Sequence, residues 1–367
     1  MTHVSELGAN PLDVVRDDCQ SIAERLGDDV QRFAGKTVLI TGAAGMLPAY
    51  LVDVLAHLND TKRLAKPVEI LAVVRSPDSN EFRLRHLRGR KDVQFILADA
   101  AMPFEVEERV HFYVHAASPA SPTAYRADPV GTLEVNGPGT RHVLELAKRD
   151  AAESVLYFST SEVYGSPDAA NIPTPETYVG ATQWLGGRAC YVEGKRFGEA
   201  LCAASWEQHR TPVKIVRPFH IQGPGLRLND GRIVAELIRM GIEGLPFELK
   251  SNGMATRTYG YISDAAFAFL KVLLSNEDGE AFNVGADNPE TSMKELASIV
   301  SRIFGRTEPV RVGADTRAAH LAGAPDRVRP DLAKIRDRLG VVPMVSLEDG
   351  LQRTIHWHRS RLAVAAS

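Results

Sequence analysis

Short apolar runs alternate with longer helical segments from residue 36 onward, and this alternation constrains the fold more than any other feature. The runs are KTVLIT, VEILAVV, VQFILAD, FYVHAA, SVLYFST and VKIVRPF. They are rich in β-branched residues and apolar at consecutive positions, which is typical of strands buried on both faces. Helical segments lie between them, in LPAYLVDVLAHLN, GTLEVNGPGTRHVLELAKRD and CYVEGKRFGEALCAASWEQHR. The alternation predicts an α/β fold with a doubly wound parallel sheet and right-handed crossovers.

The first predicted strand runs directly into a glycine-rich turn. Gly42 and Gly45 occupy the first two positions of a Gly-x-x-Gly-x-x-Gly loop that opens a helix. Gly42 permits the tight turn, and Gly45 lets the backbone approach a pyrophosphate at the helix N-terminus. Pro48 replaces the third glycine, which is tolerated because the first helical turn has N–H groups without intrahelical acceptors. The loop predicts a Rossmann-type dinucleotide site.

The ends of the second and third strands bear on the choice of dinucleotide. Arg75 follows the second strand, where a protein that binds unphosphorylated NAD usually has an acidic residue. An arginine there can pair with a 2′-phosphate, so NADP stays open beside NAD. Asp99 follows the third strand, and we expect it to contact the adenine edge.

The chain divides into four expected segments. Residues 1–34 form an N-terminal helical extension, and residues 35–216 form the Rossmann domain. Glycine and proline then cluster, and residues 217–355 are expected to form a smaller mixed lobe that interleaves with the Rossmann domain and binds substrate. Residues 356–367 are expected to be a loose tail. Helices in the smaller lobe are predicted in GRIVAELIRMGIEG, SMKELASIVSRIFG and LAKIRDRLG.

The N-terminal extension is predicted to contain an amphipathic helix over residues 12 to about 34. Its apolar residues recur at helical spacing, opposite a polar face that carries Asp17, Asp18 and Glu24. We expect it to pack on the outside of the main lobe with a structural role.

Composition excludes several classes of partner. The 367 residues are 24% charged and 44% hydrophobic, with a net charge of −3, so neither nucleic acid nor an anionic membrane is expected as a partner. The three cysteines have no metal-ligand spacing, and no metal is expected. The start is polar and acidic, unlike a signal peptide, and no apolar run approaches the ~20 residues of a membrane span. We expect a cytoplasmic protein.

The pair Tyr191 and Lys195 carries the most chemistry. Residues four apart share one face of a helix, so the phenol and the ammonium can point into one site. A nearby cation is expected to lower the tyrosine pKa and make it a competent base for a substrate hydroxyl. Thr160 follows a strand in YFSTSEVYG, where its hydroxyl can assist Tyr191. Ser161 and Glu162 come next, and Glu162 is a candidate acid or base.

Together these residues resemble the extended short-chain dehydrogenase/reductase superfamily, which includes nucleotide-sugar epimerases, dehydratases and decarboxylases. Within it, the chain is most similar to the UDP-glucuronate decarboxylases, which make UDP-xylose. The similarity covers about residues 36 to 355. It rests on ASPASPTAYRADPVGTLEVNGPGT, STSEVYG, RACYVEGKR, LNDGRIVAELI and TRTYGYISD.

The resemblance implies a role for each matching residue. Tyr191 would be the base, Lys195 its modulator and Thr160 the third member, with Ser161 and Glu162 beside them. The implied cofactor contacts are Gly42, Gly45, Met46, Leu47, Arg75, Asp99, Ala100, Ala116, Ala117, Ser118, Tyr191 and Lys195. The implied substrate contacts are Ser118, Glu162, Arg188, His220, Arg232, Arg257 and Arg327.

Two positions depart from the decarboxylase pattern. Those enzymes have a segment like RIFNTYGPRM, whereas this chain reads RPFHIQGPGL. His220 stands in place of an asparagine, and Gly225 in place of an arginine. Together with Pro48 and Arg75, they suggest a divergent branch that acts on a different nucleotide sugar.

The resemblance implies NAD-dependent oxidation at sugar C4, with Tyr191 taking the hydroxyl proton. The resulting 4-keto group acidifies C5, and a C6 carboxylate is then lost as CO₂, with Glu162 and Arg257 managing the carboxylate and the reprotonation. A 4,6-dehydratase with Glu162 as the C5 base and a C4 epimerase stay open. So does a non-catalytic nucleotide-binding protein, which the intact Thr160, Tyr191 and Lys195 set argues against. A homodimer through the helices of residues 130–149 and 190–209 is implied by resemblance alone.

Overall fold

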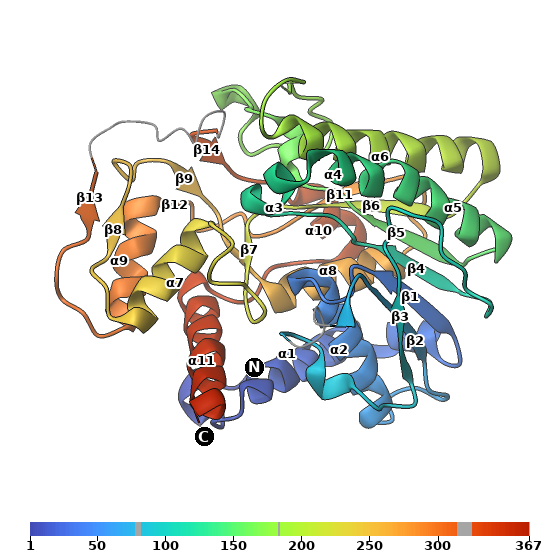
Figure 1. The fold of residues 1–367 in the computed structure, drawn as a ribbon, viewed down its shortest axis with the longest axis horizontal. Helices are drawn as coiled ribbons and strands as arrows, with labels where there is room; N and C mark the ends of the chain where they lie inside the picture. Colours follow the sequence, from blue (N-terminus) through green and yellow to red (C-terminus); the bar gives the residue numbers. More distant parts are fainter. Residues whose placement is uncertain (78–81, 183, 314–324, 367) are drawn as a thin grey trace.

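The computed structural model describes residues 1–77, 82–182, 184–313 and 325–366. Its centre is a seven-stranded sheet in which every pairing is parallel (Figure 1). In sheet order, the strands are β11 (Ala281–Val284), β6 (Val213–Pro218), β5 (Ser154–Phe158), β4 (Phe112–His115), β1 (Thr37–Thr41), β2 (Glu69–Val74) and β3 (Val93–Leu97). The sheet confirms the predicted α/β Rossmann-type fold, because the order reverses on either side of β1.

All six strands predicted for this sheet are present, and its seventh strand was missed. β11 extends the sheet beyond β6, although its four residues come from the C-terminal half of the chain. The short run AFNV is interrupted by Asn283, whose side chain donates to backbone carbonyls of Thr174 and Asp331. β3 is the opposite edge, and it is only partly buried, so the expectation of burial on both faces fails there.

Helices cover both faces of the sheet (Figure 1). One face carries α4 (Pro129–Asn136), α5 (Pro138–Arg149) and α6 (Ala189–His209), and the other carries α2 (Met46–Asp60) and α8 (Ile262–Leu273). The predicted helical segment GTLEVNGPGTRHVLELAKRD is two helices, because Pro138 starts a new first turn after Gly137. Sequence analysis missed α8, which is buried on nearly every side and therefore lacks an amphipathic pattern.

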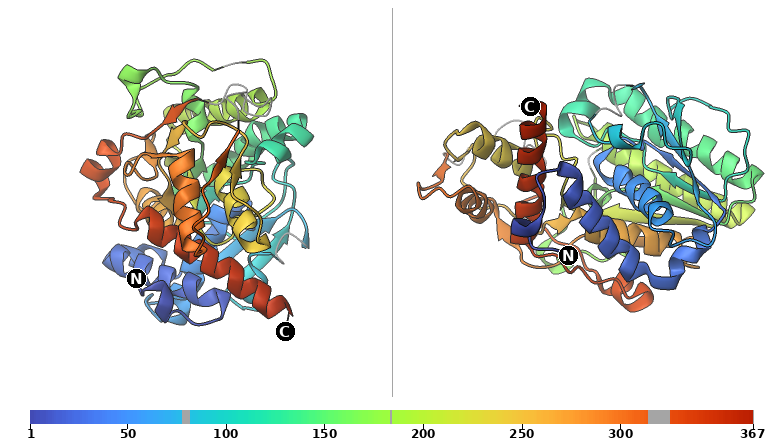
Figure 2. Two further views of the ribbon diagram at one scale, coloured as in Figure 1. Left: turned by 90° about the vertical axis from the view of Figure 1, so that its left-hand side faces the viewer. Right: turned by 90° about the horizontal axis from the view of Figure 1, so that it is seen from below.

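The N-terminal helix is shorter than predicted. α1 (Pro11–Leu26) ends at Gly27, which has φ +55°, and a 3-10 helix (Gly27–Phe33) follows. It packs against α2, α8 and the C-terminal helix α11 (Leu347–Ala366), as Figure 2 shows. The helix therefore packs outside α2 and α8 of the main lobe, as expected, and also contacts α11 of the smaller lobe.

Asp18 explains why the polar face was misread. Its carboxylate is fully buried and accepts hydrogen bonds from the hydroxyls of Tyr50 (2.9 Å) and Tyr261 (2.7 Å). The guanidinium of Arg353 on α11 is 3.0 Å away. A buried carboxylate with three partners belongs to the packing of α1, so the face that carries Asp18 is not solvated.

The smaller lobe consists of helices and short strand pairs. The helices are α7 (Ile233–Glu243), α9 (Met293–Ile303), α10 (Ala333–Leu339) and α11. The paired strands are β7 (Ile221–Gln222) with β10 (Gly260–Tyr261), β8 (Glu248–Leu249) with β13 (Arg311–Val312), and β9 (Thr256–Arg257) with β12 (Thr291–Ser292) and β14 (Arg327–Val328).

The short helices in the earlier part of the chain are α3 (Pro122–Ala127) and the 3-10 turns Val4–Glu6, Arg85–Leu87, Ser161–Tyr164 and Ala169–Asn171.

The predicted tail is wrong, because α11 continues to Ala366. Trp357 in this stretch is buried and belongs to the main apolar core, which anchors the helix. Within the described residues, no helix combines the length and apolarity that crossing a membrane requires.

Candidate active site

The glycine loop has the geometry that a dinucleotide requires. Gly42 has φ +66°, and a Cβ there would lie 2.7 Å from the Cα of Ala117, so only glycine fits. Gly45 precedes the first residue of α2 and caps it without a side chain. The N–H groups of Met46 and Leu47 therefore lie in a first turn with no side-chain cap, as a pyrophosphate site needs. Pro48 occupies the third helical position, where the prediction that it is tolerated holds.

The residues after β4 support this loop from the neighbouring strand. The backbone N–H groups of Ala116 and Ala117 both donate to the hydroxyl of Thr41, each at 3.2 Å. The hydroxyl of Ser118 accepts a hydrogen bond from the Asn136 side chain at 3.0 Å. These contacts fix the segment against the carboxyl end of β1, where cofactors bind in doubly wound sheets.

The expected cofactor contacts after β2 and β3 lie just beyond the ends of these strands, as the sequence predicted. Arg75 is exposed immediately after β2, and Asp99 is exposed two residues after β3, where it accepts the N–H of Ala101 at 3.0 Å. Ala100 is buried, and its carbonyl would be 2.3 Å from a Cβ on Gly139 of α5. Their contacts with a cofactor remain predictions.

The structure brings Thr160, Tyr191 and Lys195 together. Tyr191 and Lys195 are both buried on the same side of α6, and Thr160 lies near enough to the Tyr191 phenol to favour its phenolate form. The Lys195 ammonium donates to the backbone carbonyl of Phe158 at 2.6 Å. Phe158 ends β5, so the strand fixes the lysine and the loop after it fixes the threonine.

The expected lowering of the tyrosine pKa is not found. Burial raises the pKa of Tyr191 above its ordinary value, and the charge of Glu162 raises it further, while the Thr160 hydrogen bond opposes both. Lys195 is fully buried, and this desolvation lowers its pKa to about 7. The prediction fails because the ammonium is directed to the Phe158 carbonyl, so its charge does not dominate at the phenol.

Glu162 forms an ion pair that the sequence did not predict. Its carboxylate is 2.6 Å from the guanidinium of Arg188, the residue that precedes α6. Ser161 lies between Thr160 and Glu162 in the 3-10 turn after β5. The two catalytic candidates on this turn therefore face different partners, the threonine toward Tyr191 and the glutamate toward Arg188.

Sequence reasoning also missed Tyr125. Its ring stacks on the Tyr191 ring at 5.2 Å between centroids and 10° between planes. The residue is fully buried, and its hydroxyl has no hydrogen-bond partner in the protein. The segment ASPTAYRADP contains it, but only the fold shows that α3 places this ring against α6.

Burial and the charges of three arginines lower the pKa of His220. Burial lowers the pKa of His220 to about 3, and the charges of Arg257, Arg232 and Arg188 add to this effect, so the imidazole is neutral at pH 7. Its Nδ1 is buried without a partner. The substrate residues predicted from distant segments are therefore close enough to form one electropositive region.

The arginines differ in how they are held. Arg257 on β9 donates to the backbone carbonyls of Thr256 (2.7 Å) and Asp326 (3.0 Å). Arg232 pairs with Asp230 at 2.5 Å, just before α7. Arg257 thus presents a buried charge held by carbonyl oxygens, an arrangement suited to an incoming anion.

A family model supplies the next observation. The model described as "NAD dependent epimerase/dehydratase family" matches residues 38–285, which include the glycine loop, Thr160, Tyr191, Lys195 and Arg257. The chain belongs to this family. NAD is the cofactor of the NAD dependent epimerases and dehydratases, and the glycine loop fits it.

Curated members of the family extend the similarity over most of the chain. UDP-glucuronic acid decarboxylase 1 of Xenopus tropicalis is 34% identical over 328 residues, which are 89% of this chain and 73% of that protein. UDP-glucuronic acid decarboxylase 3 of Arabidopsis thaliana is 33% identical over 329 residues, covering 89% and 90%.

Solved structures show the same fold. The dTDP-glucose 4,6-dehydratase of Streptomyces venezuelae has a TM-score of 0.75 at 23% identity, covering 89% of this chain and 98% of that one. UDP-glucose 4-epimerase of Thermotoga maritima has a TM-score of 0.74 at 20% identity, covering 89% and 99%.

Arg327, which is expected to contact the substrate, forms an ion pair within the protein. Arg327 on β14 forms a double ion pair with Glu290, at 2.6 and 2.7 Å, and its side chain is 43% exposed. The arginine lowers the pKa of Glu290 to about 2. Its contact with substrate remains a prediction.

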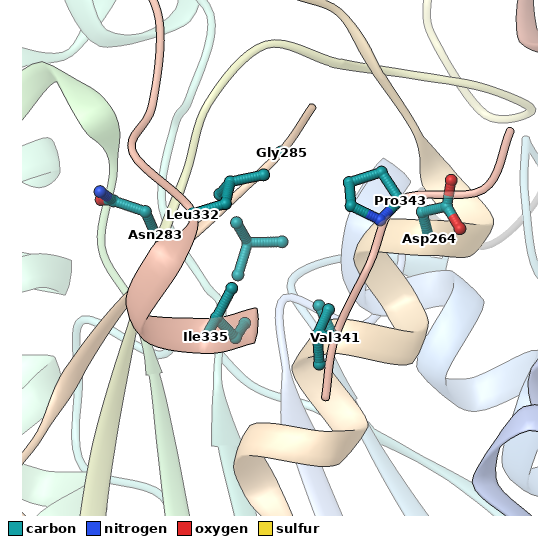
Figure 3. A pocket seen from close by; sticks show the side chains of 9 residues that line it. Asp264, Asn283, Gly285, Leu332, Ile335, Val341 and Pro343 are labelled. Carbon is teal, nitrogen blue, oxygen red and sulfur yellow. The ribbon is translucent and has the colours of Figure 1, made fainter. Parts of the chain in front are cut away.

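A cavity elsewhere in the fold is too small to bind a nucleotide. It lies between α8, β11 and α10, and Figure 3 shows Leu332, Ile335 and Val341 around it. Its volume is about 10 Å³, room for about one water molecule. The catalytic candidates lie outside it.

Proposed function

We propose that the protein converts a nucleotide sugar through oxidation at C4 and that its reaction is that of a UDP-glucuronate decarboxylase. The proposal rests on one observation: two groups of catalytic candidates lie side by side. Tyr191 with Thr160 can remove a hydroxyl proton, and the Glu162–Arg188 pair adjoins it. The curated relatives at about a third identity are named for this reaction, which supports the proposal.

Thr160, Tyr191 and Lys195 form the base side of the site, which acts on the C4 hydroxyl. Tyr191 accepts the proton in its phenolate form, which the contact with Thr160 favours, and becomes a neutral phenol. Lys195, held by the Phe158 carbonyl, would bind the ribose of the cofactor. NAD supplies the hydride acceptor when it is bound.

The anion side of the site consists of Glu162, Arg188, Arg257 and His220. It acts on the carboxylate and on C5. Arg257 and Arg188 balance the charge of the C6 carboxylate, which orients it for loss as CO₂ once C4 is a ketone. Glu162 would take a proton from solvent and deliver it to C5, and return of the hydride to C4 would then give the UDP-pentose. His220 is neutral and can accept or donate one hydrogen bond without adding charge.

The test is incubation of the purified protein with NAD and a panel of nucleotide sugars that includes UDP-glucuronate, UDP-glucose and dTDP-glucose. CO₂ release with a UDP-pentose product supports the decarboxylase. A 4-keto-6-deoxy product identifies a 4,6-dehydratase, and unchanged mass with new stereochemistry identifies a C4 epimerase. No conversion of any member would favour a non-catalytic nucleotide-binding protein.

The dehydratase and epimerase alternatives rest on particular residues. Ser161 stands where dTDP-glucose-type dehydratases have an aspartate, so the chain is poorly equipped to protonate a leaving 6-hydroxyl in that way. An epimerase needs only Tyr191, Lys195 and room for the sugar to turn. His220 and Gly225 replace the asparagine and arginine of the decarboxylases, which keeps the identity of the sugar and of the nucleotide in play.

NADP is a second candidate cofactor because of Arg75. The guanidinium is exposed immediately after β2, where an acidic residue would repel a 2′-phosphate. Titration with NAD and NADP tests this: Arg75→Asp should weaken NADP binding and leave NAD binding unchanged or tighter.

We further propose that the protein is a homodimer that works in the cytoplasm. α4 and α6 pack together and expose Val130 (65%), Leu133 (44%) and Phe197 (54%) on neighbouring surfaces. Exposed apolar groups on a paired helix face favour association with a second copy. Light scattering should give a dimer for the wild type and a monomer for Phe197→Glu, whereas the exposed Val364→Glu on α11 should stay dimeric.

A further inference from the structure

A cluster of arginines lies outside the substrate site, where three parts of the chain meet. Arg227 follows Gly225 in the loop after β7, Phe82 and Arg83 lie between β2 and β3, and Arg361 is on α11. The guanidinium carbons of Arg361 and Arg227 lie 4.2 and 4.7 Å from the centre of the Phe82 ring. Arg361 also lies 4.8 Å from the Trp357 ring. Two aromatic rings thus hold the guanidinium groups in place.

Among the described residues, the protein balances only part of the positive charge of this cluster. Arg83 pairs with Asp53, but the same carboxylate is 2.8 Å from His86. In the described part of the chain, Arg227 and Arg361 have no carboxylate within ion-pair distance. The charges of Arg83 and Arg227 add to burial in lowering the pKa of Arg361, so the three groups are close enough to repel one another.

Buried donors without partners point into the same region. Arg83 is only 4% exposed, and its buried Nε has no hydrogen-bond partner. Gly225, with φ +92°, faces it: a Cβ there would lie 3.2 Å from this nitrogen. His358, beside Arg361 in contact with Trp357, has a buried Nε2 that also lacks a partner. Such groups are costly unless something completes them.

We propose that Arg83, Arg227 and Arg361 form a binding site for a phosphate group. Guanidinium groups bind phosphate through paired, charge-assisted hydrogen bonds, and a dianion would balance Arg227 and Arg361 together. The site adjoins the cofactor loop, because the side chain of Met46 lies 3.5 Å from the Cβ position on Gly225. The phosphate therefore belongs either to the dinucleotide cofactor or to a separate ligand. The proposal does not depend on the reaction proposed above.

Calorimetry with inorganic phosphate at constant ionic strength tests the site without turnover. Saturable binding is expected for the wild type, and Arg361→Gln should weaken it by about ten-fold or more, the effect of one charge-assisted hydrogen bond. Arg359→Gln is the matched control, because Arg359 is on the same helix and contacts a different ring, Phe304 at 4.6 Å. Arg359→Gln should bind phosphate as the wild type does.

Titration with NADP and NAD separates the two sources. If Arg361→Gln weakens NADP binding and spares NAD, the site holds the cofactor's 2′-phosphate. If phosphate still binds to protein saturated with NADP, the site takes a separate ligand. Should Arg361→Gln perturb folding, Arg227→Gln at an exposed position gives the same test. Phosphate binding that survives both substitutions unchanged, or heat that depends only on ionic strength, would overturn the proposal.

Discussion

The base side and the anion side of the site are built in opposite ways. Thr160, Tyr191 and Lys195 are at most 7% exposed, and the Lys195 ammonium donates to the carbonyl of Phe158 on the strand beneath them. The anion side concentrates cations, with Arg188 and Arg257 around a neutral His220. Arg257 is 7% exposed as well, so the two sides differ in their charge and not in the burial of these residues.

The largest effect is expected from removing the base. Tyr191→Phe should lower kcat by about 10²- to 10⁴-fold, the usual contribution of a positioned acid or base, with little change in substrate binding. Steady-state kinetics and an equilibrium binding assay check both parts. Tyr178→Phe is the control, because Tyr178 contacts Tyr164 away from the base and should keep full activity.

The next effect probes the anion side. Arg257→Gln should lower kcat/KM for UDP-glucuronate by about ten- to a hundred-fold, because one charge-assisted contact is lost. Competition by UDP-glucose, which lacks the carboxylate, should change much less. Arg239→Gln is the control, since Arg239 lies outside the proposed site and Glu243 on the same helix already holds that guanidinium. Equal losses for both sugars would show that Arg257 does not bind the carboxylate.

A smaller effect concerns the buried charge on the base side. The pKa of Lys195 falls from an ordinary 10.5 to about 7 in the folded protein. Between these values the unfolded state binds more protons, so Lys195 makes stability rise with pH, by up to about 1.4 kcal/mol per pH unit. Lys195→Met should lack this rise in urea unfolding measured at pH 7 and pH 9. Parallel pH profiles of variant and wild type would argue against a buried ammonium.

The smallest effect is expected at His220. Its pKa is about 3 when folded, below the ordinary 6.5, so stability should be lost as pH falls through this window. His220→Asn should retain more of its melting temperature between pH 7.5 and pH 5 than the wild type does. At pH 7 the two should melt alike, because the imidazole is already neutral.

The sequence predicted the sheet well because its strands carry their signal locally. Six β-branched runs became six strands, but β11 has only four residues and pairs with a strand more than sixty positions earlier. The segment of α8 is apolar all round, so no face marked it as a helix. The end of α11 looked like a tail because Trp357 is buried only through contacts that the fold creates.

The site was predicted to a similar degree, and for a similar reason. Tyr191 and Lys195 are four residues apart on one helix, so their shared face could be read directly. The ion pair of Glu162 with Arg188 and the stacking of Tyr125 depend on separate elements that meet only in the folded chain. The raised pKa of Tyr191 was missed because burial and hydrogen-bond direction are not visible in spacing.

The most direct test of the account is CO₂ release from UDP-glucuronate labelled at C6, measured with NAD for the wild type and for Tyr191→Phe. The account predicts labelled CO₂ and a UDP-pentose from the wild type, and a loss of at least about a hundred-fold in the variant. Equal CO₂ release from both proteins would contradict the role of Tyr191. A wild type that converts other nucleotide sugars but releases no CO₂ would contradict decarboxylation.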